Sequence, residues 1–217
     1  IESDEGKFIL SLNLKDLSFE LYDQYFNSIW LINSQGKSIL EVEGQLDSGL
    51  DAVGLSDSSW KDQMHYEIPD YGFNKSPIER LSDSQINLWS DFRALANYAC
   101  LDLLGSLQAD SEMRIWPHHF DTGIYFKLSD QLGIGFGLAM KDEMAADAYF
   151  YLTAHSDTIH FDYSKFSSDG DWEWKSGEWK GALLRLNALS ALDTNASLKM
   201  VKSFSSSALE QYCMQLA

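Results

Sequence analysis

The sequence predicts an α+β fold, in which helices pack against one antiparallel sheet of about five or six strands. Apolar residues recur at helical spacing in the segments 15–34, 84–107 and 195–215. Between the last two segments, apolar and polar residues alternate along short runs that turn residues separate. We therefore treat residues 1–217 as a single domain, with a helix- and loop-rich part over 1–82 and the sheet within 83–217.

The composition is strongly acidic, with 16 Lys and Arg against 33 Asp and Glu and a formal net charge of −17. Such a surface repels phosphate groups, so we expect neither a nucleic acid nor a membrane as a partner. No apolar run is long enough to span a bilayer. Cys100 and Cys213 lack metal or redox spacing and no signal peptide is visible, which favours the cytoplasm, although a leader removed before Ile1 would leave no trace.

In the N-terminal part, Leu14, Leu17, Leu21, Tyr25 and Ile29 fall at helical spacing and predict the helix over 15–34. The segment 38–50 is compatible with a helix or a strand, and the spacing of its apolar residues favours the helix. Alternation over 64–68, ahead of a proline, predicts a short edge strand.

The segment 84–107 carries the clearest helical pattern. Ser82 and Asp83 can cap its start, and Gly105 can close its end. Its alanines would permit close packing on a flat surface, so this helix is our main candidate to cover the glycine-rich strand face described next.

The stretch 114–155 predicts three antiparallel strands with two very different faces. Pairing Leu128 with Leu132 places large apolar side chains on one face. The other face then carries acidic, glycine and tyrosine residues from all three strands: Asp121, Gly123, Tyr125, Gly133, Gly135, Gly137, Tyr149, Tyr151 and, near Gly133, His155. Glycine inside a strand weakens it and often marks the close approach of a backbone or a ligand.

Two interpretations of the glycines remain open. The simpler interpretation is that a helix packs on the glycines, which would fit a structural or oligomerising protein without a ligand. The more specific interpretation is a flat binding surface for a small molecule. Tyr125, Tyr149 and Tyr151 would form its walls, with His119 and Asp121 at one end. We take His119, Asp121, Tyr125, Tyr149 and Tyr151 as candidate ligand-binding residues.

His119 and Asp121 project from the same face of a strand, so together with Glu143 they form an alternative metal site for a metal-assisted hydrolase. His118 points to the apolar face and is more simply a core histidine. A hydrogen bond between His119 and Asp121 is the plainer interpretation, so we predict no metal. Asp142, Glu143 and Asp147 could supply paired carboxylates, although a solvated turn explains them as well.

No serine nucleophile elbow, Walker loop or dinucleotide fingerprint is present, and we expect no cofactor. The sequence leaves open whether the protein is an enzyme, and it leaves its oligomeric state open. Beyond the three strands, alternation predicts further strands over 158–163 and 181–189. Trp172, Trp174 and Trp179, with Tyr163, fit core packing better than an aromatic ligand rim.

Four runs carry a resemblance: IWPHHFDTG over 115–123, GIGFGLA over 133–139, AYFY over 148–151 and GEWKGA over 177–182. They resemble a group of uncharacterised proteins from Bacteroidetes, over about residues 84–190. A family of unknown function with aromatic strands and a C-terminal helix is more distantly similar. The resemblance implies a bacterial, cytoplasmic α+β protein and assigns no activity, cofactor or catalytic residue.

Overall fold

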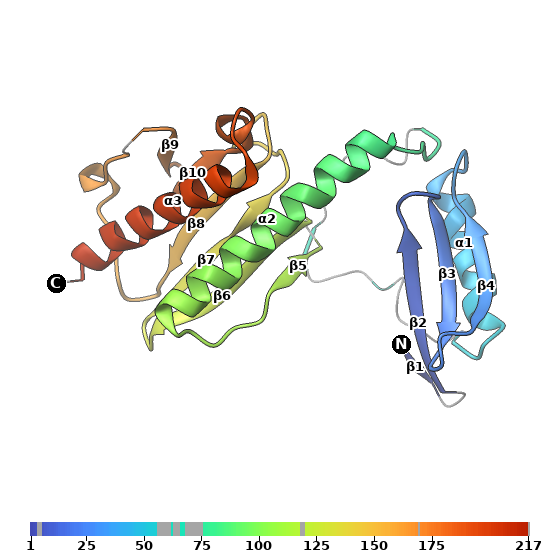
Figure 1. The fold of residues 1–217 in the computed structure, drawn as a ribbon. Coiled ribbons are helices and arrows are strands. Elements are labelled where there is room, and N and C mark those ends of the chain that lie inside the picture. Colours follow the sequence, from blue (N-terminus) through green and yellow to red (C-terminus); the bar gives the residue numbers. More distant parts are fainter. Residues whose placement is uncertain are drawn as a thin grey trace. The chain divides into compact units, whose positions relative to one another are not determined.

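The computed structural model describes residues 1–3, 6–55, 62, 66–67, 76–117, 120–168 and 170–216. The chain divides into two compact units, Ile1–Trp89 and Ser90–Ala217, where the sequence analysis treated it as one domain (Figure 1). The fold class is α+β, as predicted, with antiparallel sheets and helices that pack against them.

The N-terminal unit contains a four-stranded antiparallel sheet of strands in chain order: β1 (Glu2–Ser3), β2 (Gly6–Asn13), β3 (Ser18–Asp23) and β4 (Ser28–Asn33). The helix predicted over 15–34 is therefore wrong. The spacing of four between its apolar residues arises because two strands flank a turn. In that turn Asp23 accepts hydrogen bonds from the backbone N–H groups of Tyr25 (2.8 Å) and Asn27 (2.9 Å).

The segment after β4 is the helix α1 (Ile39–Asp51), as the apolar spacing favoured. It begins with a capping box, in which the Ser38 hydroxyl accepts from the Glu41 N–H and the Glu41 carboxylate accepts from the Ser38 N–H. Its buried residues Val42, Leu46 and Leu50 pack on the sheet. The strand predicted over 64–68 falls on a segment of which the structure describes only 66–67.

The C-terminal unit contains the predicted antiparallel sheet, with the order β5-β6-β7-β8-β10-β9. Its strands are β5 (Arg114–Trp116), β6 (Asp121–Ser129), β7 (Leu132–Ala139), β8 (Tyr149–His155), β9 (Trp172–Ser176) and β10 (Lys180–Arg185). The register is largely as predicted: Tyr125 pairs with Gly135, and Gly133 with His155. The exception is Leu132, which pairs with Ser129 because a bulge follows Lys127.

The strand predicted over 158–163 is wrong, since this segment is irregular and ends in a short 3-10 helix (Tyr163–Lys165). The backbone of Asp162 finds its partners elsewhere than in a sheet. Its N–H donates to Oε1 of Gln215 (2.8 Å), and its carbonyl accepts from Nε2 of the same side chain (3.0 Å). The predicted strand over 181–189 is shorter than expected, because Leu186–Leu189 forms a 3-10 helix.

The helices α2 (Asp83–Leu107) and α3 (Thr194–Met214) confirm the predicted segments 84–107 and 195–215. Both pack against the large apolar side chains of the six-stranded sheet (Figure 1). Their buried residues form one core with those side chains, and the Cys100 thiol lies 3.9 Å from the Phe136 carbonyl oxygen. The prediction that α2 covers the glycines is therefore wrong, because the helices follow the larger apolar area.

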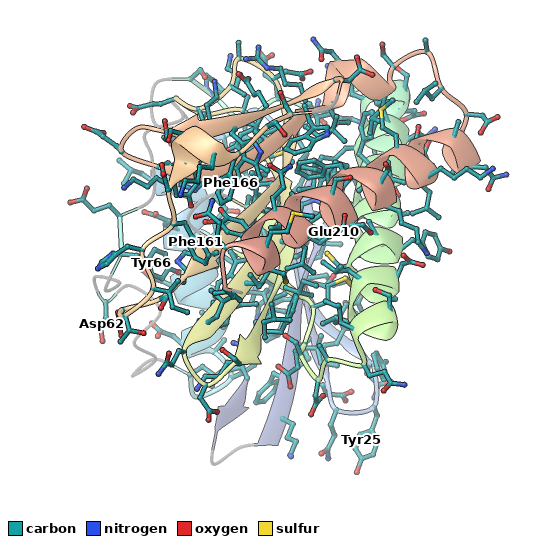
Figure 2. The ribbon with its side chains drawn as sticks, turned by 90° about the vertical axis from the view of Figure 1, so that its left-hand side faces the viewer. Tyr25, Asp62, Tyr66, Phe161, Phe166 and Glu210 are labelled. Carbon is teal, nitrogen blue, oxygen red and sulfur yellow. The ribbon has the colours of Figure 1, made fainter. Side chains whose placement is uncertain are left out.

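An aromatic cluster closes the core at the end of α3. Figure 2 shows Phe161 and Phe166 beside α3, where the Phe166 ring lies 5.1 Å from the ring of buried Tyr212. Trp174 lies 5.2 Å from the same ring, and Trp172 lies 5.4 Å from Phe204. Core packing is thus confirmed for Trp172 and Trp174. No helix in the described part of the chain is long and apolar enough to cross a membrane.

Candidate functional site

The glycines lie on the face of the six-stranded sheet that points away from α2 and α3. We call it the glycine face and define it by the residues of β6 to β8 that point away from the helices: Asp121, Gly123, Tyr125, Gly133, Gly135, Gly137, Tyr149, Tyr151, Thr153 and His155. Each pair predicted for its middle is observed, including Gly123 opposite Gly137. Both helices of the unit contact the opposite face, so the tyrosines and glycines are left to form a surface of their own.

Tyr151 explains two of the glycines. It pairs with Gly137 on β7, and its hydroxyl donates to Oδ2 of Asp121 on β6 at 2.5 Å. The side chain therefore passes over the intervening strand. A Cβ on Gly137 would lie 3.0 Å from the Tyr151 hydroxyl oxygen, and one on Gly123 would lie 2.8 Å from it. Only glycine leaves room for this crossing.

Other aromatic side chains lie on glycines in the same way. A Cβ on Gly133 would lie 2.0 Å from the Tyr125 hydroxyl oxygen, and one on Gly181 would lie 2.5 Å from the Trp179 ring. Gly135 is the more open position, because the nearest atom to its Cβ would be Cγ2 of Thr153 at 3.1 Å. Aromatic side chains, rather than a helix, thus cover part of the strip. Gly135 is itself buried, but it has more room above it and lines a hollow.

Two adjoining hollows open between these rings. The first, of about 460 Å³, lies over Gly135 between Trp116, Tyr125 and Tyr151. The second, of about 300 Å³, lies between Tyr149, Tyr151 and Trp179. Both are lined by Asp121, Tyr151, Thr153 and His155, so they form parts of one surface.

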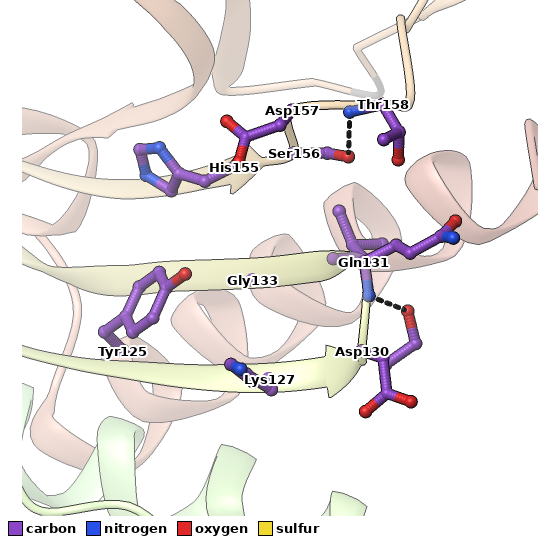
Figure 3. A pocket seen from close by; sticks show the side chains of 11 residues that line it. Tyr125, Lys127, Asp130, Gln131, Gly133, His155, Ser156, Asp157 and Thr158 are labelled. Carbon is purple, nitrogen blue, oxygen red and sulfur yellow. Dashed lines mark hydrogen bonds between the residues drawn. The ribbon is translucent and has the colours of Figure 1, made fainter.

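A third hollow, of about 320 Å³, lies at the end of the β6–β7 hairpin. Figure 3 shows Tyr125 of β6 and His155 of β8 on either side of Gly133, with Lys127, Asp130 and Asp157 at the rim. His155 lines all three hollows, and its ring lies 5.9 Å from that of Tyr125. Partial burial lowers the pKa of His155 and so favours the neutral imidazole.

Asp121 is the buried charge of the site, with 7 % of its surface exposed. Burial raises the pKa of Tyr151 far above its usual range, and the charge of Asp121 adds to this, so the phenol keeps its proton and donates it. On the helix side of β6, the Arg93 guanidinium donates to the Thr122 hydroxyl and to the Phe120 carbonyl. Burial lowers the pKa of Arg93, and the charge of Asp121 opposes that shift.

A second tyrosine–aspartate pair lies beside the first. The Tyr149 hydroxyl donates to Oδ2 of Asp142 at 2.6 Å, and Oδ1 of Asp142 accepts from the Met144 N–H at 2.7 Å. Tyr149 and Tyr151 lie two residues apart on β8 and so share a face. The sequence analysis treated Asp142 as a turn residue or a possible acid–base group and did not place it with Tyr149.

Among the predicted site residues, the structure brings Asp121, Tyr125, Tyr149 and Tyr151 to one face. His118 and His119 lie outside the described residues, so the pairing of His119 with Asp121 stays a prediction. Within the described part of the chain, no group of three or more His, Cys, Asp or Glu side chains is placed to hold a metal ion. The alternative metal site of His119, Asp121 and Glu143 depends on a residue outside that part.

Four residues that line the hollows were not among the five candidate ligand-binding residues, although the predicted register had placed His155 on this face. Thr153, His155 and Trp116 belong to strands of the same face, and Trp179 reaches it from the β9–β10 turn. Alternation along β8 places Thr153 on the same face as His155. Trp179 had been assigned to core packing, with an aromatic ligand rim as the alternative, and it is the rim position that the structure gives it. No protein family, curated protein or solved structure matches the chain.

Proposed function

We propose that the C-terminal unit is a small-molecule-binding domain whose ligand lies on the glycine face. The observation that supports this most directly is the pair of adjoining hollows, because both are lined by the buried Asp121 and by Tyr151. A concave, largely aromatic surface with a few convergent polar groups is the usual form of a ligand site. Most of the wall comes from strands of one sheet, which hold side chains in place more firmly than loops do.

The walls are also organised before a ligand arrives. The bond from Tyr151 to Asp121 fixes the ring over Gly137, and the bond from Tyr149 to Asp142 fixes the neighbouring ring. Because the side chains are already ordered, ordering them on ligand binding costs little free energy. The open space over Gly135 accepts a flat group between the rings of Tyr125 and Tyr151.

A fragment screen on the full-length chain tests this proposal. We would record amide chemical-shift changes by NMR for a library of small aromatic and heteroaromatic fragments, then repeat the hits with Gly135→Val. The valine side chain would contact Thr153 and extend into the first hollow. We expect hits to shift the amides of the glycine face, and Gly135→Val to stay folded and lose them.

The control variant is Gly105→Ala, which changes an exposed glycine in α2 where a Cβ meets no atom within 4 Å. It should keep every hit. The proposal is wrong if no fragment shifts the glycine-face amides, or if the Gly135→Val protein is folded and binds the same fragments equally well.

A further inference from the structure

The two adjoining hollows are rich in hydrogen-bond acceptors. Four hydroxyls line them, and three of these, on Tyr149, Tyr151 and Thr153, already donate their one proton within the protein. Tyr151 donates to Asp121 at 2.5 Å, Tyr149 donates to Asp142 at 2.6 Å, and Thr153 donates to the Lys180 carbonyl at 2.9 Å. The oxygens of these three hydroxyls can still accept, and the carboxyl groups of Asp121 and Asp142 are further acceptors at the wall, so a ligand with N–H donors complements this part of the hollows.

The charges at the wall have one sign. Asp121 and Asp142 are carboxylates, and no Lys or Arg is among the described residues that line these two hollows. Arg93 lies on the helix side of β6, where it donates to Thr122 and to the Phe120 carbonyl and its guanidinium carbon lies 4.7 Å from the centre of the Phe120 ring. It does not line the hollows, and its charge acts on Asp121 from that side of the strand. Burial lowers the pKa of His155 and so disfavours a positive charge on its imidazole.

The aromatic rings supply the third feature. Five of the lining side chains carry phenol or indole rings: Trp116, Tyr125, Tyr149, Tyr151 and Trp179. The face of such a ring is electron-rich and attracts ammonium groups, most strongly where water is excluded. Rings, carboxylates and hydroxyl lone pairs thus surround the same space.

We propose that the glycine face binds a small organic cation, an aromatic amine in its ammonium form. The ammonium group donates to Asp121 or Asp142, and the aromatic group lies over Gly135 between Tyr125 and Tyr151. This inference rests on the proposed function and names the ligand class for the same hollows. A multivalent metal ion fits less well, because no group of three metal-ligating side chains is present among the described residues.

Three matched probes test the charge of the ligand on the full-length chain at neutral pH: 2-phenylethylammonium, neutral 2-phenylethanol and anionic 3-phenylpropionate. Each would be titrated while amide shifts are followed by NMR. We expect the ammonium compound to bind at least about tenfold more tightly than the other two, because it alone makes a charge-assisted hydrogen bond to a carboxylate. Its shifts should be centred on Gly135 and Tyr151.

Single substitutions then identify the carboxylate that binds the ammonium group. Asp121→Asn and Asp142→Asn should each weaken binding of the ammonium probe several-fold and leave 2-phenylethanol unchanged. Asp110→Asn removes an exposed carboxylate outside the hollows and should have no effect. If Asp121→Asn does not fold, as judged by circular dichroism, the half-buried Asp142 decides the question.

The inference is overturned if the neutral or anionic probe binds the glycine face as tightly as the ammonium probe, an outcome that leaves the proposed binding function standing. It is also overturned if none of the three probes binds, or if the ammonium probe binds the folded Asp142→Asn and Asp121→Asn proteins as tightly as the parent. Failure of the binding function itself is a separate result, since it requires that the whole fragment library leave this face unshifted.

Discussion

The hydroxyl of Tyr151 on β8 donates to the carboxylate of Asp121 on β6 at 2.5 Å, across the whole width of β7. Gly137 lies beneath the crossing, and Gly123 lies beneath the hydroxyl. Glycine inside a strand weakens it, and these two glycines are present because the Tyr151 side chain must lie flat on the strands at those positions. The same bond places a buried acid at the wall of both hollows.

Tyr151→Phe should destabilise the C-terminal unit by about 1–3 kcal/mol, because it removes a donor from a buried charged group. Tyr149→Phe is the matched control. It removes the donor to Asp142, which is half-buried and can take water instead, so we expect a smaller loss of about 0.5–1.5 kcal/mol. Urea unfolding followed by tryptophan fluorescence measures both. If both variants lose the same free energy of unfolding, the burial of Asp121 does not increase the cost of removing its hydrogen-bond donor.

Gly137→Ala should destabilise the sheet by about 1–3 kcal/mol through overpacking. Its Cβ would lie 2.5 Å from the Thr122 carbonyl oxygen and 2.7 Å from Cα of Gly123, and backbone atoms cannot move aside. Gly135→Ala should change the free energy of unfolding by less than about 1 kcal/mol, since its nearest neighbour is a methyl group at 3.1 Å. Thermal unfolding of the two variants measures this difference. Similar midpoints would contradict the contact distances of the two added Cβ atoms.

The two cysteines should differ in reactivity. Burial, together with the charge of Asp121, raises the pKa of the Cys100 thiol to about 12, whereas Cys213 is exposed. The thiolate is the reactive form, so the native protein should show one accessible thiol per chain through about pH 9. Titration with a disulfide reagent measures this, and unfolding in guanidinium should release the second. Rapid modification of both thiols in the native state would mean that Cys100 is not enclosed by α2 and β7.

His155 should make stability depend on pH in one direction. Its pKa in the folded protein lies below the ordinary value, so the unfolded chain takes up the proton first. The free energy of unfolding should therefore fall as the pH is lowered through the ordinary histidine range, from about pH 7.5 to about pH 5. His155→Gln should show a shallower fall over that interval, and an equally steep one would contradict the prediction.

Protonation of His155 also places a positive charge in the hollows that we propose for an ammonium ligand. Affinity for 2-phenylethylammonium should decrease over the same pH interval, while that for 2-phenylethanol should not. The His155→Gln protein should keep its affinity for the ammonium probe until the carboxylates themselves are protonated. Calorimetric titration at several pH values measures these affinities.

Most of the C-terminal sheet could be predicted because one face is buried. A shift of one residue would have turned Phe136 and Ile134 away from the core, so the alternation fixed the register. The position of α2 could not be predicted in the same way. Its small residues fit either face, and the large apolar side chains around Phe136 decided the outcome. The sequence shows glycines but not which side chains lie across them.

The N-terminal unit shows the limit of spacing arguments. Apolar residues at Leu17, Leu21 and Tyr25 fit a helix, yet Leu21 lies in β3, while Leu17 and Phe26 adopt left-handed backbone conformations in turns. The hydrogen bonds of Asp23 to the turn backbone decided against a continuous helix. In the candidate site, Asp121 and the three tyrosines followed from alternation, whereas Trp179 came from a turn distant in sequence.

The most direct test of the account is a crystal structure of the full-length chain soaked with 2-phenylethylammonium. We expect electron density for the probe over Gly135, between Tyr125 and Tyr151, with its nitrogen about 2.7–3.2 Å from a carboxylate oxygen of Asp121 or Asp142. A protein segment packed on Gly135 in that crystal, or a probe bound only on another surface, would contradict it.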